Sequence, residues 1–88
     1  MVITRQMVAG RISAYLRGQE SLTEIVSWAE EAMREEEFAE QDFTVIRDVV
    51  ARLGLADVAA FGLTWEDAVD MLLRLGYRAT VEIQAQRA

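Results

Sequence analysis

The chain contains neither cysteine nor histidine, and lysine, asparagine and proline are missing as well. Without cysteine, disulfides and thiolate nucleophiles are impossible. Without histidine, the chain lacks the side chain that most often accepts a proton near neutral pH. The serines therefore have no histidine base, and the glycines are scattered singly instead of forming a phosphate-binding loop. We predict that the protein is not an enzyme and that it uses no cofactor.

Long apolar runs are also missing. Stretches such as 58–61 are far shorter than the roughly 18–20 residues that a membrane helix requires. No basic and then apolar leader, the mark of a signal peptide, opens the sequence. The chain has 88 residues, of which 52% are hydrophobic, which suits one core and a single helical domain over 1–88. We expect a cytoplasmic protein that does not bind membranes.

Positive charge is scarce and comes from arginine alone. Nine basic residues face 15 acidic ones, which leaves a formal net charge of −6. A protein that binds nucleic acid directly needs clustered Lys and Arg, so this function class is not expected. The negative charge instead favours attraction of a basic partner at low salt.

Two helices are predicted in the first half of the chain. Apolar residues recur at helical spacing over 5–17, and Gly18 ends this stretch because glycine tolerates a left-handed turn. Ser21 and Glu24 have the spacing of a capping box, which begins a second helix. Its apolar stripe comprises Leu22, Ile25, Val26, Ala29, Ala32 and Met33. A continued helix would place Glu36 on that stripe, so the helix must end within 35–37.

The second half predicts two more helices and a strand. Asp42 is expected to cap a third helix that ends at Gly54, and a short helical turn is expected over 56–61. Thr64 begins a fourth helix, in which Trp65 lies on the buried face, and Gly76 ends it. The strict alternation after Gly76 predicts a strand over 77–84.

The strand over 77–84 needs a partner for its backbone amides and carbonyls. The start of the chain, 1–3, is the only other strand candidate, so the C-terminal strand pairs either with these residues or with a second chain. The predicted fold is mainly α: a compact array of four main helices with a short C-terminal β-strand. Pairing of Tyr77–Gln84 with its copy would make the protein a homodimer.

Seven carboxylates crowd the region between the second and third helices, and we call them the acidic region. They are Glu30, Glu31, Glu35, Glu36, Glu37, Glu40 and Asp42. They can form a solvated face, a docking patch for a basic partner, or ligands of a hard cation. The chain has neither the Gly-containing calcium loop nor the histidines of carboxylate di-metal bundles, so no metal is expected.

Trp28 lies on the flank of the second helix, away from the middle of its apolar stripe. A Trp in this position either covers the edge of the core beneath a loop or is exposed as an anchor for a partner. The acidic region and Trp28 together are our candidate partner-binding site.

Several short patterns resemble those of small bacterial all-helical proteins that have no assigned activity. They are Tyr15-Leu16-Arg17-Gly18, Ser21-Leu22, Trp28-Ala29, 53–57, 61–67 and 75–77. The Tyr-Leu-x-Gly pattern with the following serine is more loosely similar to helical immunity proteins that block bacterial toxins, which are commonly acidic. This second resemblance implies a toxin-immunity or antitoxin-like inhibitor.

Taken together, these features predict a non-catalytic protein-interaction module that binds a protein partner, in the simplest case a basic one. The alternatives are the toxin-immunity protein, a homodimeric structural protein and, least favoured, a carboxylate–metal enzyme. In a variant of the main hypothesis the acidic region imitates nucleic acid, and the partner is itself a DNA- or RNA-binding protein.

Overall fold

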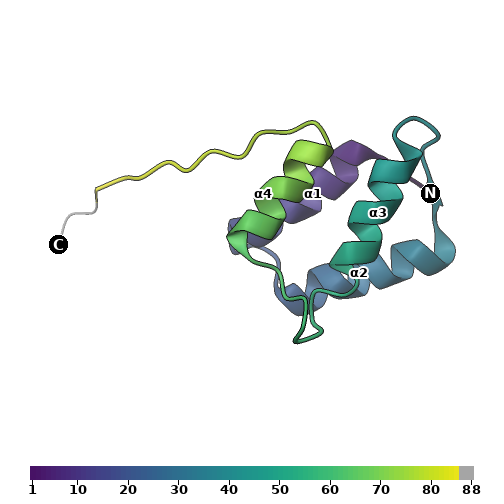
Figure 1. Cartoon of the computed structure of the whole chain (residues 1–88), viewed down its shortest axis with the longest axis horizontal. Helices are drawn as coiled ribbons and strands as arrows, with labels where there is room; N and C mark the ends of the chain where they lie inside the picture. Colours follow the sequence, from purple (N-terminus) through teal and green to yellow (C-terminus); the bar gives the residue numbers. More distant parts are fainter. Residues whose placement is uncertain (86–88) are drawn as a thin grey trace.

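A computed structural model describes residues 1–85 and confirms a compact, mainly α fold (Figure 1). Within these residues the helices are α1 (Arg5–Leu16), α2 (Leu22–Glu35), α3 (Phe43–Leu53) and α4 (Trp65–Arg74). Two short strands, β1 (Val2–Ile3) and β2 (Glu37–Phe38), complete the set of regular elements. α2 packs chiefly against α3, and α1 against α4, with α1 also in contact with α2 and α3.

Three helices begin where their side chains predict. The Thr4 hydroxyl accepts a hydrogen bond from the Met7 amide at the start of α1. At α2 the Ser21 hydroxyl accepts from the Glu24 amide while the Glu24 carboxylate accepts from the Ser21 amide, at 3.1 and 3.0 Å. Thr64 and Asp67 form the same reciprocal pair at α4. These bonds satisfy amides that have no partner within the helix.

The ends of α1 and α4 share one backbone motif. Gly18 and Gly76 have φ values of 74° and 93°, in the left-handed region. After α4 the Tyr77 amide donates to the Leu72 carbonyl at 2.8 Å and the Gly76 amide to the Leu73 carbonyl at 3.0 Å. This pair of bonds is a Schellman motif, which ends the helix and turns the chain sharply away.

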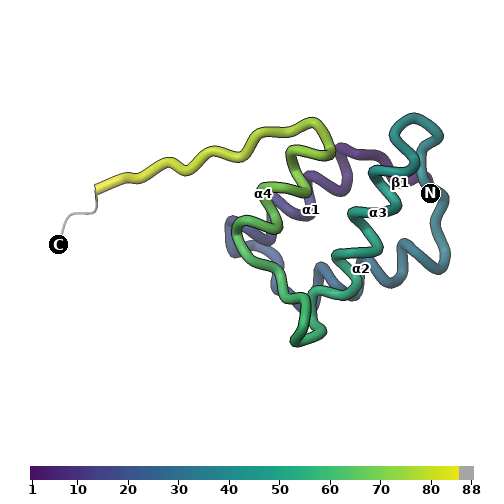
Figure 2. The backbone as a smooth tube through the Cα atoms, in the orientation of Figure 1, coloured from purple at the N-terminus to yellow at the C-terminus, as the bar shows by residue number. Residues whose placement is uncertain are grey.

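α2 ends at Glu35, within the predicted interval, and the chain continues as β2. β1 pairs with β2 in parallel, with Val2 opposite Glu37 and Ile3 opposite Phe38. The prediction of a C-terminal strand was therefore wrong for this fold: residues 77–85 form no strand, and the N-terminal residues pair with 37–38 instead. The alternation over 77–84 did not specify a partner, and these residues instead run as an extended chain (Figure 2).

The core lies between the helices and includes β1. Its largest fully buried side chains are Ile3, Val8, Ile12, Ile25, Val26, Ile46, Val49, Val50 and Leu53. The core also contains Ala68, Met71 and Leu72 of α4, the helix that packs against α1. The apolar faces predicted for the helices thus supply most of the core.

Three details of the sequence prediction were wrong. Met33 and Trp65, both assigned to buried faces, are 43% and 44% exposed. Asp42 precedes α3 but makes no side-chain capping bond; it has φ 66°, and its backbone carbonyl accepts from the Ile46 amide. Over 56–61 the chain forms hydrogen-bonded turns, in which the Phe61 and Gly62 amides both donate to the Val58 carbonyl, in keeping with the short helical turn expected there.

Candidate functional site

The acidic region lies at one end of the molecule. It occupies the C-terminal half of α2, β2 and the loop that leads to α3. Each of its seven carboxylate side chains is exposed except that of Glu36, which is partly buried. The structure thus brings the predicted acidic residues onto one continuous stretch of surface chain.

Few cations neutralise this region. The Met1 ammonium lies 2.9 Å from the Glu36 carboxylate, and Arg5 Nε lies 3.9 Å from the Asp42 carboxylate. The hydrogen bond and the charge of Glu36 together raise the pKa of the Met1 ammonium above its ordinary value. Among residues 1–85, five of the acids form no ion pair: Glu30, Glu31, Glu35, Glu37 and Glu40. The acidic region therefore carries excess negative charge at its surface.

Part of this negative charge lies at the C-terminal end of α2, where the helix dipole disfavours it. Glu35 is the last residue of α2 and Glu36 is its C-cap, where the unpaired carbonyls make the helix end negative. A carboxylate in this position costs up to about 1 kcal/mol, and Arg34 in the last turn offsets only part of that. Helix stability therefore does not explain why acids are concentrated here.

Trp28 lies at the edge of the core and packs against α1, not beneath a loop. The Arg11 guanidinium sits 5.0 Å from the centre of the Trp28 ring and also pairs with Glu20. Glu20 is 8% exposed, and Arg11 is its ion-pair partner. Trp28 is half-buried, so it is neither a fully exposed anchor nor a side chain fully covered at the edge of the core.

A surface hollow of about 460 Å³ lies beside Trp28, and we call it the Trp28 hollow. Its lining residues are Met1, Met7, Gly10, Arg11, Ala14, Glu20 and Trp28. A Cβ added at Gly10 would meet nothing within 4 Å, so this glycine leaves the surface of α1 open. The sequence did not predict that Met1, Met7 and Arg11 line this hollow, since no local pattern indicates that α1 and the N-terminus lie beside Trp28.

The Trp28 hollow adjoins the acidic region. Glu31 and Glu35 follow Trp28 at spacings of three and seven residues, which places all three along one side of α2. Met1 lines the hollow and is ion-paired with Glu36. The Trp28 hollow therefore lies next to the acidic region, to which Met1 connects it.

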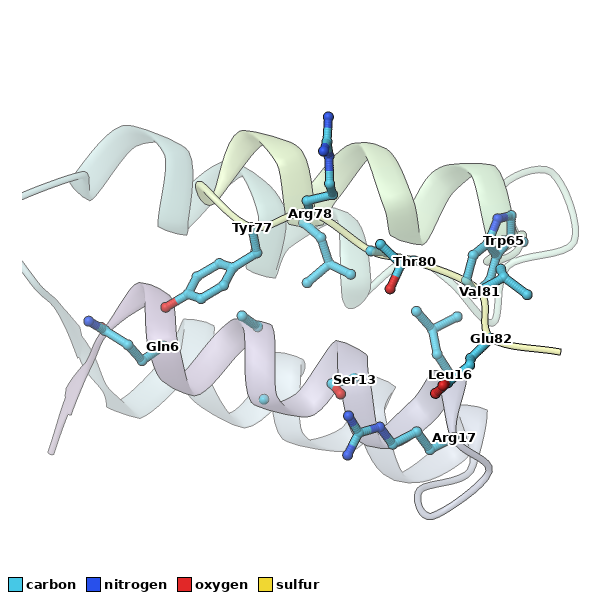
Figure 3. A pocket seen from close by; sticks show the side chains of 14 residues that line it. Gln6, Ser13, Leu16, Arg17, Trp65, Tyr77, Arg78, Thr80, Val81 and Glu82 are labelled. Carbon is cyan, nitrogen blue, oxygen red and sulfur yellow. The ribbon is translucent and has the colours of Figure 1, made fainter. Parts of the chain in front are cut away.

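A second, larger groove of about 890 Å³ runs between α1 and α4, and we call it the α1/α4 groove (Figure 3). Gln6, Ser13, Leu16 and Arg17 line it from α1, and Trp65 lines it from α4. Residues 77–82 lie along it. The exposure of Trp65 was missed because the helical period cannot distinguish a core face from the wall of a groove.

The acidic region does not have the geometry of a metal site. Within the described part of the chain, no three acidic side chains come together closely enough to hold a metal ion. In the same residues, no helix is both long and apolar enough to cross a bilayer.

Comparison of the chain with protein-family models, with curated proteins and with solved structures gave no match.

Proposed function

We propose that this protein is a non-catalytic interaction module that binds a basic segment of another protein. The acidic region would attract the Lys and Arg side chains of that segment, and the Trp28 hollow would accept an apolar side chain from it. The observation that carries the proposal is that Met1 both lines the Trp28 hollow and pairs with Glu36 of the acidic region. Five further carboxylates of that region form no ion pair among residues 1–85.

The chemistry of the two parts supports one kind of partner. Methionine side chains adapt to different apolar shapes, and a Trp is a common anchor in protein interfaces. The exposed acids provide long-range attraction and orient an incoming basic chain. An amphipathic helix with one basic and one apolar face satisfies both requirements.

A synthetic amphipathic helix made of leucine and lysine is a suitable probe. In a Trp65→Phe background, Trp28 is the sole Trp, so its emission should shift to shorter wavelength as the peptide covers the hollow. Neutralising three acids (Glu31→Gln, Glu35→Gln and Glu37→Gln) should weaken binding about tenfold, because each exposed pair contributes about 0.5 kcal/mol.

The matched control removes the same charge elsewhere, with Asp57→Asn, Glu66→Gln and Asp70→Asn. All three residues are exposed and lie outside the acidic region. This control should bind nearly as well as the unchanged protein, and binding should weaken as salt is raised towards about 1 M, where the Debye length is about 3 Å. Equal losses in the two triple variants, or an affinity that ignores salt, would show that net charge or apolar contact alone drives binding.

A further inference from the structure

The segment after α4 leaves the helical body as an extended chain. Residues 77–85 run along the α1/α4 groove and then project beyond it (Figure 2). The Tyr77 amide belongs to the Schellman motif, but residues 78–85 make no backbone hydrogen bond with any other residue from 1 to 85. An extended chain with free amides and carbonyls becomes a strand only when a neighbour pairs with it.

The side chains of this segment are divided between its two faces. Tyr77 and Ala79 are half-buried and pack against the core, while the alternate residues Arg78 and Thr80 are exposed. The same alternation puts Val81 and Ile83 on the Tyr77 side, yet they are 66% and 90% exposed. Val81 and Ile83, which strongly prefer half-buried strands, are thus exposed, and Val81 lines the same groove as the partly exposed Trp65.

We infer that the missing neighbour is the same segment of a second copy, paired antiparallel about a two-fold axis at Thr80. In this register Arg78 lies opposite Glu82 of the second copy, and Thr80 lies opposite its own equivalent. On the other face, Tyr77 lies opposite Ile83 and Ala79 opposite Val81. Opposite charges, paired threonines and an aromatic beside a β-branched residue are the cross-strand pairs that stabilise sheets.

The positions of Arg78 and Glu82 favour this register over the other possible registers of the same two strands. Moving the axis to Val81 places Arg78 opposite Gln84 and leaves Glu82 opposite Thr80. Axes at Arg78 or at Glu82 bring like charges together. A shift of the register by one residue would place apolar side chains opposite polar ones, because it turns one strand over relative to the other. Only the register centred on Thr80 pairs both charges and keeps each face uniform.

In the proposed dimer the segment gains both a neighbouring strand and an apolar surface on which the resulting ribbon packs. A two-stranded ribbon alone is marginal in water and needs a hydrophobic surface to pack on. The apolar face of this ribbon lies on the side of the α1/α4 groove, where Leu16 and Trp65 form part of the wall. The contact is isologous, so it closes at a dimer and leaves the acidic region free.

Sedimentation over a range of micromolar concentrations tests the dimer. Arg78→Glu alone and Glu82→Arg alone each turn two attractive pairs into two repulsive ones, and each should raise the dimer dissociation constant about tenfold or more. The double variant exchanges the charges and should recover the original value. Both side chains are exposed, so the circular dichroism of the helices should not change.

Cysteine crosslinking tests the register, because the chain has no cysteine of its own. Under mild oxidation, Thr80→Cys should give a disulfide-linked dimer, since the two introduced thiols face each other across the axis. Gln84→Cys, nearer the end of the same segment, is the control and should crosslink more slowly. A monomer at every concentration overturns the inference, and so does faster crosslinking at the control position or no recovery in the charge-exchanged double variant.

Discussion

Gly54 and Gly76 each follow an Arg-Leu pair at a helix end, but their backbones differ. Gly54 has φ −64° and ψ −17°, an ordinary helical conformation. Gly76 has φ 93°, and a Cβ built on it would lie 2.7 Å from Arg5 Nη1. That guanidinium donates to the Leu75 carbonyl and lies 5.7 Å from the centre of the Tyr77 ring. Of the two, only Gly76 is therefore required by its backbone conformation, and a Cβ there would also make the flexible Arg5 side chain move.

Alanine substitution should separate these two glycines. Gly76→Ala is expected to lower the free energy of unfolding by about 2 kcal/mol, because alanine is strained at positive φ and would displace Arg5. Gly54→Ala should be neutral or raise it by about 0.5 kcal/mol, since its Cβ would make only ordinary contacts, the nearest at 3.5 Å. Urea denaturation measures both, and equal effects would contradict this account of the helix ends.

At the scale of elements, the starts of α2 and α4 depend on ionised carboxylates. Glu24 accepts hydrogen bonds from the amide and hydroxyl of Ser21, and these bonds lower the pKa of Glu24 below its ordinary value. The amide and hydroxyl of Thr64 lower the pKa of Asp67 in the same way. A carboxylate whose pKa is lower in the folded than in the unfolded protein stabilises the folded state at pH values above the unfolded-state pKa. This stabilisation is lost as the pH falls through the folded-state pKa.

This linkage predicts how stability changes in acid. Below about pH 4 the melting temperature should fall, in part because Glu24 and Asp67 become protonated. The variant Glu24→Gln/Asp67→Asn should be less stable at neutral pH and should lose less stability between neutral pH and this acid range. The control, Glu31→Gln/Asp57→Asn, removes exposed acids that cap no helix and should keep the original slope. Calorimetry across pH compares the three proteins.

At the scale of the whole molecule, the two ends of the chain behave differently. The N-terminal end is part of the fold: β1 joins β2, and Ile3 is 1% exposed. The Ala39 amide donates to the Ile3 carbonyl at 3.0 Å, which fixes β1 beside the chain that leaves α2. The C-terminal end, from Val81 to residue 85, leaves the body and contributes no buried side chain.

Truncation of side chains at the two ends should show this difference. Ile3→Ala should lower the free energy of unfolding by about 3 kcal/mol, because a large core side chain is lost. Val2→Ala and Ile83→Ala should each change it by less than about 1 kcal/mol, since both side chains are substantially exposed. Denaturation must be followed at low protein concentration, where the monomer is measured. A large effect of Ile83→Ala under those conditions would mean that the C-terminal segment belongs to the monomer core.

The sequence by itself determined the helices and most of the core. Capping side chains at Ser21 and Thr64, and glycines at positions 18 and 76, act within a few residues, so their effect can be seen in the order of amino acids. The end of α2 was also predictable, because a continued helix would bury Glu36. Of the candidate site, sequence predicted an acidic surface beside Trp28, since both lie on one helix and the loop after it.

Tertiary structure alone decided which distant segments meet. β1 pairs with 37–38 and not with 77–84, because the core that buries Ile3 holds β1 against the end of α2. Trp65 lies on the apolar face of α4, yet it is 44% exposed and lines the α1/α4 groove. Periodicity specifies a face and an extended backbone, whereas the partner depends on packing between residues far apart in the chain.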